Sequence, residues 1–311
     1  SVVGRAELLS FFFASLSLFA WLRTKFIISA LLFFAAVLSK ETAIALPVIL
    51  FILSVYRKKS PIWLCYFGIA VFSYAILRFW VLGGFALEPQ VEFVFNPLKF
   101  VSLPERLATT LKISVGYLRN TVFPFYLSPD YSFNQIPLVN KIWSSVQAIL
   151  GLLIIILASL FLVFNVYRKK FECAVLSVSF FLFPYLIVSN FVLLTGTIMA
   201  DRLMYWPSFG VVFAVALWFN LLLRLGAPVK IFYFLAGGVI FIYSILTINQ
   251  NKFWTDEEKL FDAMFQRSPN SIVARTNWAR ILTNRGQAEE AQALLLETLK
   301  IFPDFAPTLN M

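Results

Sequence analysis

The sequence contains no histidine and only two cysteines, and charged residues make up 14% of its 311 residues. Without histidine, these residues provide neither a histidine-ligated metal site nor a serine–histidine relay. Cys65 and Cys173 lie in separate apolar segments, so the chain shows no disulfide framework. Because an average soluble domain has about 25% charged residues, the low charge excludes an ordinary soluble enzyme and a disordered chain.

The chain is rich in hydrophobic residues. They make up 60% of the chain, aromatic residues make up 18%, and 36 residues are Phe. Residues 1–250 carry 19 Lys/Arg and 8 Asp/Glu, a net charge of +11, whereas residues 251–311 carry 7 and 8, a net charge of −1. This composition predicts an all-α protein with a polytopic membrane domain over 1–250 and a soluble region over 251–311.

Eight apolar segments of about 15–25 residues are predicted to cross the membrane. They cover residues 7–22, 26–39, 42–56, 61–82, 142–167, 172–194, 204–224 and 229–249. The basic clusters Arg23/Lys25, Arg57–Lys59, Arg168–Lys170 and Arg224/Lys230 then all fall on one side of the membrane. The positive-inside rule assigns that side to the cytoplasm. We therefore expect a lipid bilayer, and no nucleic acid, as the partner of the basic residues.

The loop 83–141 and the region after residue 250 are predicted to lie on the opposite, non-cytoplasmic side. Within that loop, residues 105–126 are amphipathic, and we expect an interfacial or cavity-lining helix there. One further membrane span in this segment would reverse the predicted side of everything that follows it.

The soluble region is predicted to contain tetratricopeptide repeats. Pro269 and Pro303 are 34 residues apart, which is the period of that repeat. The residues predicted to pack its helices or to turn between them are Trp278, Ala279, Leu282, Gly286, Ala291 and Pro303. Repeats of this kind offer a concave surface for peptides. A plain helical hairpin is the alternative.

Charged residues gather at the predicted non-cytoplasmic face, where Arg or Lys could bind an anionic group and carboxylates could orient a sugar hydroxyl. The candidate residues for binding a donor phosphate or substrate are Arg5, Glu7, Lys40, Glu41, Asp130, Asp201, Arg202 and Tyr205. Interfacial salt bridges are the alternative explanation. We expect Arg78 to extend to the same interface, and Tyr117, Tyr126, Tyr131 and Trp206 to form an aromatic belt. No metal site is predicted.

An ordered set of motifs runs along nearly the whole chain. It consists of Gly4-Arg5-Ala6-Glu7, Ser39-Lys40-Glu41, Asp130-Tyr131-Ser132, Ala200-Asp201-Arg202-Leu203-Met204-Tyr205 and the repeats. Each motif is weak alone, but together they resemble the transmembrane and tetratricopeptide-repeat-containing proteins. That family is similar to the protein O-mannosyltransferases, which are membrane glycosyltransferases of the C-type fold.

The resemblance implies transfer of a sugar from a polyprenyl-phosphate donor to Ser or Thr of a protein outside the cytoplasm, and mannose is the sugar that we expect. It implies no cofactor in this chain, an acceptor protein bound through the repeats, and a catalytic acid in a loop upstream of Ser1. We therefore expect a fragment, truncated at both ends. One departure is that the family motif usually has Glu before Arg, where this chain has Asp201; whether a divalent metal takes part stays open.

Two other functions stay open from the sequence. A non-catalytic membrane scaffold could use the repeats to recruit partners, and a transporter could also place charges within the membrane. The transporter is disfavoured, since no internal repeat of spans is visible. We expect a bacterial inner membrane with the repeats in the periplasm; the alternative is the endoplasmic reticulum membrane with the repeats in the lumen.

Overall fold

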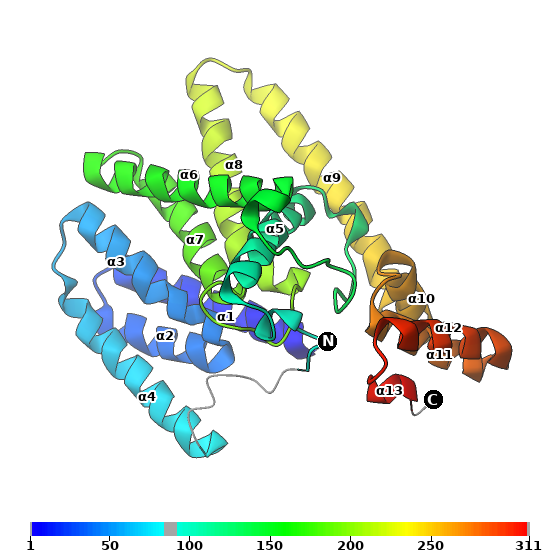
Figure 1. Ribbon diagram of the computed structural model, residues 1–311. Helices are drawn as coiled ribbons and strands as arrows, with labels where there is room; N and C mark the ends of the chain where they lie inside the picture. The colour runs from blue at the N-terminus through cyan, green and yellow to red at the C-terminus, as the bar shows by residue number, and fades with distance from the viewer. Residues whose placement is uncertain (1, 84–91, 310–311) are drawn as a thin grey trace. The chain divides into compact units, whose positions relative to one another are not determined.

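The structure is a computed structural model that describes residues 2–83 and 92–309. All regular elements in this part of the chain are helices (Figure 1). The α-helices are α1 (Val2–Leu22), α2 (Phe26–Ser39), α3 (Ala45–Arg57), α4 (Leu64–Leu82), α5 (Leu103–Val122), α6 (Val146–Arg168), α7 (Glu172–Val188), α8 (Tyr205–Arg224), α9 (Val229–Phe253), α10 (Glu257–Arg267), α11 (Ile272–Asn284), α12 (Ala288–Ile301) and α13 (Ala306–Leu309). The expected all-α class is therefore confirmed.

Five of the described helical segments are long and apolar enough to cross a membrane. They are Gly4–Leu22, Pro61–Leu82, Val146–Arg168, Asp201–Arg224 and Val229–Phe253. The other three predicted spans also form helices, but α2, α3 and α7 have 14, 13 and 17 residues. About 20 residues are needed to cross the hydrocarbon core, so the chain is a membrane protein with about five candidate spans, and the count of eight stays a prediction.

The chain divides into two compact units. Unit 1 comprises Ser1–Pro89, Leu152–Leu193 and Arg202–Leu221, and unit 2 comprises Gln90–Gly151, Leu194–Asp201 and Leu222–Met311. Both units are discontinuous in sequence, and the segment after residue 250 falls into unit 2 together with residues 92–102, which precede α5. The predicted domain boundary at residues 250/251 stays a prediction.

Helices α1 and α2 of unit 1 form an antiparallel pair (Figure 1). The hydroxyl of Ser17 donates to the carbonyl oxygen of Ser29 at 2.7 Å, and the hydroxyl of Ser29 donates to the carbonyl oxygen of Ser17 at 2.8 Å. Both serines are fully buried. Such reciprocal bonds between small residues hold helices together where the surroundings are as apolar as the helices themselves.

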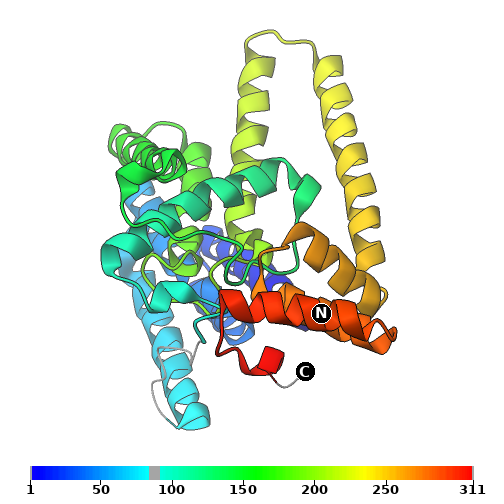
Figure 2. The ribbon, with the colours of Figure 1, turned by 45° about the vertical axis from the view of Figure 1, so that its right-hand side comes forward.

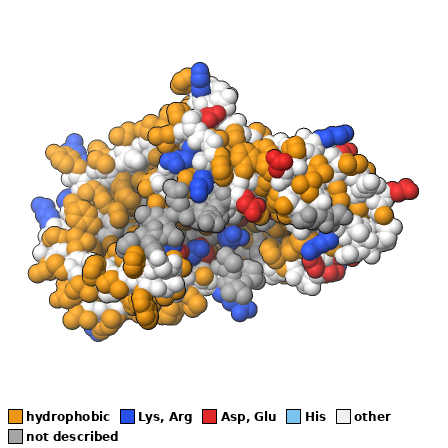
Figure 3. All heavy atoms as spheres, turned by 60° about the horizontal axis from the view of Figure 1, so that its bottom comes forward, with side chains coloured by type: hydrophobic (Ala, Val, Ile, Leu, Met, Phe, Trp, Pro, Cys, Tyr) orange, Lys and Arg blue, Asp and Glu red, His pale blue; other side chains and the backbone are white. Residues whose placement is uncertain are grey.

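The core of unit 1 is aromatic and aliphatic. Trp21, Phe33, Trp63 and Phe67 are buried against the inner residues of α3. On the face visible in Figure 3, the region of α2 to α4 is covered largely by hydrophobic side chains. An apolar exterior of this kind is expected where lipid, and not water, surrounds the helices.

Helices α7 and α8 of unit 1 approach each other at Gly210. A Cβ atom at this position would lie 2.4 Å from the backbone nitrogen of Phe181 and 2.5 Å from the carbonyl oxygen of Ser177. The hydroxyl of Ser177 also donates to the carbonyl oxygen of Gly210 at 2.8 Å. The missing side chain therefore permits the contact, and the serine reinforces it.

In unit 2, the amphipathic segment predicted over 105–126 forms α5. It begins with a capping box, in which Glu105 accepts a bond of 3.1 Å from the backbone N–H of Ser102. Helix α5 is not among the candidate membrane spans of the described residues. Whether it lies at the membrane interface or lines a cavity stays a prediction.

The region after α9 folds into the helices α10, α11 and α12, and α11 packs antiparallel to α12 (Figure 2). Ala279, Leu282 and Ala291 form a buried cluster, against which Trp278 packs. Gly286 has φ +78° in the turn between α11 and α12, a backbone conformation that glycine adopts without strain. Pro303 is exposed in the turn that follows α12. The helical pairs are clear, and their assignment as tetratricopeptide repeats stays a prediction.

Candidate functional site

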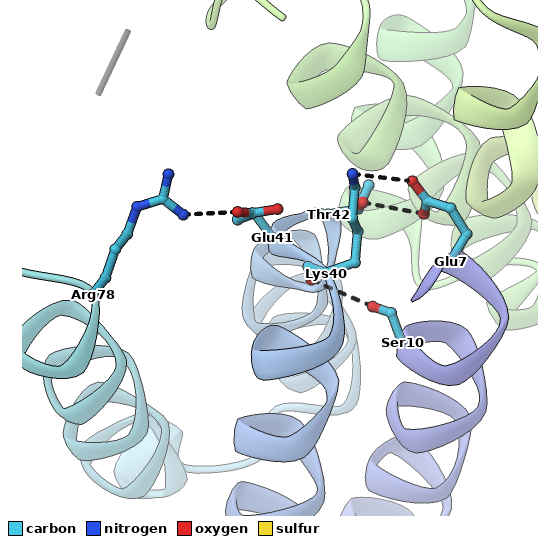
Figure 4. A network of polar contacts seen from close by, with 6 residues as sticks. All are labelled: Glu7, Ser10, Lys40, Glu41, Thr42 and Arg78. Carbon is cyan, nitrogen blue, oxygen red and sulfur yellow. Dashed lines mark hydrogen bonds and ion pairs between the residues drawn. The ribbon is translucent and has the colours of Figure 1, made fainter. Parts of the chain in front are cut away.

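The ends of α1, α2 and α4 in unit 1 carry a group of polar side chains, which we call the Glu7 cluster. It consists of Glu7, Ser10, Lys40, Glu41, Thr42 and Arg78 (Figure 4). Helix α2 ends at Ser39, and Lys40 has an extended backbone with φ −163° and ψ 136°. This break in the helix allows three consecutive residues, Lys40, Glu41 and Thr42, to contact two different helices.

Glu7 lies at the centre of this cluster with only 3% of its surface exposed. The hydroxyl of Thr42 donates to Glu7 Oε2 at 3.3 Å, and Lys40 Nζ lies 3.9 Å from Glu7 Oε1. A buried carboxylate is tolerated only with such partners, because isolated charge is poorly solvated away from water. The Lys40 side chain keeps 31% exposure, so its remaining N–H groups can reach a ligand.

The second ion pair of the cluster joins α4 to the turn after α2. Arg78 Nη1 donates to Glu41 Oε1 at 2.7 Å and to the Tyr74 hydroxyl at 2.8 Å. Burial alone would raise the pKa of Glu41, but the bond from Arg78 and the charge of Lys40 outweigh it, so the pKa lies below the ordinary carboxyl value. Glu41 is therefore an ionised partner of Arg78 at neutral pH.

The other predicted residues of unit 1 surround this cluster. Arg202 is exposed, and its charge acts on the Glu7 carboxyl. Arg5 is exposed on α1. Tyr205 contacts the ring of Phe11 edge-on, with ring centroids 5.5 Å apart. With Lys40, Arg78 and Arg202 against two acids, the local charge is suited to an anion.

Asp201 and Asp130 belong to unit 2 and form two separate networks there. Asp201 Oδ1 accepts from Asn120 Nδ2 at 3.0 Å, and Asp201 Oδ2 accepts from the Tyr131 hydroxyl at 2.8 Å. Burial, and next the charge of Asp201, raise the pKa of the Tyr131 hydroxyl. It therefore stays protonated and donates to Asp201, so both oxygens of this carboxylate are occupied by protein donors.

Asp130 connects its loop to the start of α11. Its Oδ2 accepts from the hydroxyls of Ser132, at 2.6 Å, and Ser271. Its carbonyl oxygen accepts from the hydroxyl of Ser268 at 2.7 Å. Ser271 is also the N-cap of α11 and accepts from the backbone N–H of Ala274 at 3.1 Å. In this structure Asp130 attaches its loop to the N-terminus of α11.

The geometry thus separates the candidate residues into one cation-rich cluster and two networks of internal hydrogen bonds. The sequence did not indicate Thr42 or Asn120, because a neutral side chain carries no signal without its partner. The expected aromatic belt is wrong for Trp206 and Tyr117, which are fully buried within the protein. For Tyr131, whose hydroxyl donates to Asp201, it stays a prediction. The side chain of Tyr126 lies outside the described residues.

No group of three or more Asp, Glu or Cys residues that could hold a metal ion occurs in the described ranges. The two cysteines are exposed and unpaired. The Glu7 cluster contains cationic and hydroxyl side chains, groups of the kind that can form hydrogen bonds to anions.

No family model and no solved structure matches the sequence. The chain is 27% identical over 237 residues to Protein O-mannosyl-transferase TMTC1 of Homo sapiens, which covers 73% of this chain and 25% of that protein. It is 28% identical over 260 residues to Protein O-mannosyl-transferase TMTC1 of Mus musculus, and the match covers 78% of this chain and 26% of that protein. It is 28% identical over 133 residues to Protein O-mannosyl-transferase Tmtc2 of Drosophila melanogaster, and this match covers 42% of this chain and 14% of that protein. The chain thus spans about a quarter of the length of its first two relatives.

Proposed function

We propose that this chain is part of a membrane glycosyltransferase that transfers a sugar, in our proposal mannose, to Ser or Thr residues of proteins. The observation that carries the proposal is the similarity, over about three quarters of the chain, to proteins named protein O-mannosyl-transferases. The apolar helices support the membrane location. The acceptor would be bound by the repeat helices α10 to α12, on the non-cytoplasmic side.

The proposed donor is a polyprenyl-phosphate-linked sugar, and the Glu7 cluster is its proposed phosphate site. During transfer the acceptor hydroxyl oxygen bonds to the anomeric carbon, the bond from that carbon to the phosphate oxygen breaks, and polyprenyl phosphate leaves with the negative charge. Lys40 and Arg202 would stabilise that charge. The buried carboxylate of Glu7 would orient the Lys40 ammonium toward it.

The proton of the acceptor hydroxyl must go to a base, which we assign to no residue of 1–311. In unit 1 the two candidate acids, Glu7 and Glu41, are paired with Lys40 and Arg78. In unit 2, Asp201 and Asp130 accept hydrogen bonds from the protein. For Glu41, the bond from Arg78 holds the pKa below the ordinary carboxyl value, which makes this acid a weak proton acceptor.

The test supplies radiolabelled polyprenyl-phosphate mannose to membranes that contain the full-length protein and measures label on protein. Lys40→Gln is expected to reduce transfer at least about tenfold, because a charged phosphate contact is lost. Lys25→Gln is the matched control, since it removes an exposed Lys at the other end of α2.

Label that appears with the unaltered protein and falls only in Lys40→Gln supports the proposed phosphate site. Equal transfer by both variants contradicts the role of Lys40 but not the activity. If the unaltered protein transfers no mannose from this donor, the proposed activity is wrong, and a membrane-anchored scaffold becomes the better explanation.

A further inference from the structure

The two tribasic loops of unit 1 lie far apart in the sequence but together in the structure. Arg57 is the last residue of α3 and is followed by Lys58 and Lys59. Arg168 is the last residue of α6, and Lys169 and Lys170 lie between α6 and α7. Lys169 Nζ donates to the carbonyl oxygen of Val55 at 2.6 Å and lies 5.4 Å from the centre of the Tyr56 ring. The end of α3 and the α6–α7 turn are therefore in direct contact. We call these six residues the basic patch.

The basic patch has almost no opposing charge. Glu172 is the single acid in segments 45–66 and 160–180, and Arg57 Nε donates to its Oε1 at 2.8 Å. Lys58, Lys59, Arg168 and Lys170 are exposed. Five positive charges thus remain without an acidic partner in these segments. Topology alone requires only that such charges exist on one side of the membrane, and not that they converge.

Directly beside the patch, α3, α6 and α7 line an open apolar groove of about 550 Å³. Val55, Leu162, Val163 and Val166 contribute to its wall. Among the described residues that line it, Lys169 alone is charged. The volume lies within the range of small-molecule sites, about 300–1,000 Å³.

We propose that this groove and the basic patch bind one anionic phospholipid of the surrounding bilayer. An acyl chain would occupy the groove, and the headgroup phosphate would lie against Lys169 and Arg168. Charge complementarity argues for this occupant, because basic pockets between membrane helices recognise anionic headgroups. A Lys at the mouth of an apolar groove matches a ligand with a charged head on a hydrocarbon chain. A soluble anion would use the patch but not the groove.

The site is separate from the Glu7 cluster. The groove is lined by the end of α3, the second half of α6, and Leu182 and Phe183 in the second half of α7. The Glu7 cluster instead contains residues from the start of α1, the end of α2 and the second half of α4. Lipid binding here therefore does not depend on the proposed sugar transfer. The predicted topology assigns the basic patch to the cytoplasmic leaflet, where anionic lipids are enriched.

The test reconstitutes the full-length protein into phosphatidylcholine vesicles with a trace of spin-labelled lipid. Electron paramagnetic resonance then measures the lipid fraction immobilised by the protein, once for phosphatidylglycerol and once for phosphatidylcholine. The unaltered protein is expected to prefer phosphatidylglycerol, and added salt is expected to weaken that preference. Lys169→Gln should reduce the preference about fivefold, since one Lys near an anionic surface contributes about that factor.

Two matched controls separate the groove from general surface charge. Lys230→Gln removes one exposed Lys of another predicted cytoplasmic cluster and should leave the preference unchanged. Val163→Trp fills the groove without changing charge and should reduce it, whereas Val212→Trp, at a position with 64% exposure against 66% for Val163, should not. The proposal is overturned if the unaltered protein shows no preference. It is also overturned if both Lys variants lose it equally, or if Val163→Trp retains it.

Discussion

Glu7, Asp130 and Asp201 are each held by donors from a different part of the chain. Thr42 bonds Glu7, Ser271 bonds Asp130, and Tyr131 bonds Asp201. Each of these partners is a hydroxyl that can rotate toward the acid. A carboxylate held in this way has a defined orientation. Removing its hydroxyl donor is therefore expected to destabilise the fold, as removing the acid would.

Tyr131→Phe is expected to lower the free energy of unfolding by about 1–3 kcal/mol, because the partly buried Asp201 Oδ2 loses its donor. Denaturant unfolding of the detergent-solubilised protein measures the change. Tyr233→Phe is the control, since it removes the same hydroxyl group from a side chain that is 69% exposed. Equal stability of the two variants would show that the Asp201 network carries no net stabilisation.

Glu41 predicts a dependence of stability on pH. Its folded pKa is below the ordinary value, so the Arg78 pair stabilises the fold above the ordinary pKa of about 4.3, and this contribution is lost as pH falls through the lower folded pKa. Because half of the Glu41 side chain is exposed, the effect at neutral pH is at most about 1 kcal/mol.

Glu41→Gln should therefore be slightly less stable than the unaltered protein at neutral pH, and the two should converge in acid. Thermal unfolding over a pH series measures this. Asp304→Asn, at an exposed acid beyond α12, should follow the unaltered protein throughout. A constant difference between Glu41→Gln and the unaltered protein at every pH would contradict the ion pair.

At the scale of helices, close packing depends on small residues in this protein. Ser17 and Ser29 hold α1 to α2, and Gly210 permits the contact of α7 with α8. Between helices in lipid, hydrophobicity does not favour association, so van der Waals contact and interhelical hydrogen bonds determine the pairing. Larger side chains at these positions should therefore push the paired helices apart.

Gly210→Ala is expected to destabilise unit 1 by more than about 2 kcal/mol, because the new methyl group meets backbone atoms that cannot rotate away. Gly68→Ala is the matched control in α4, where a Cβ would meet nothing within 4 Å. It should be neutral or stabilising by up to about 1 kcal/mol, since alanine favours the helix. The midpoints of thermal unfolding in detergent compare the two; a similar loss in both would exclude the steric explanation.

At the scale of the whole molecule, the number of membrane crossings determines which side each loop occupies. Five described segments meet the length and hydropathy expected for a span, while α2, α3 and α7 are shorter. Short helices can lie in the membrane when neighbouring helices cover them or when the bilayer thins locally. The predicted eight-span arrangement and the side of the membrane on which α10 to α12 lie are therefore the central points to test.

Cysteine labelling tests this arrangement after Cys65 and Cys173 have been replaced by Ser. Single cysteines at Lys59, Lys170 and Ala227 are expected to react from the same side of sealed vesicles with a membrane-impermeant maleimide. A cysteine at Asp304 should react from the opposite side. If Asp304→Cys reacts from the same side as Lys59→Cys, the predicted side of the repeat helices is wrong.

The sequence by itself determined that the chain is helical and enters a membrane, and where its helices lie. Long apolar segments in lipid are expected to form helices, because a helix lets each backbone N–H and C=O bond within its own segment. Gly286 likewise indicated the turn that follows Asn284. These features depend on residues within about one helical length of each other, and they are present in the linear order of the chain.

Only the tertiary structure decided which polar residues meet. Glu7 and Thr42 are 35 positions apart, Asn120 and Asp201 are 81 positions apart, and Arg57 and Glu172 are 115 positions apart. These pairs depend on how the helices pack, which is set by many weak contacts and small residues such as Gly210. For the same reason two basic loops that looked like separate topology signals form one patch beside an apolar groove.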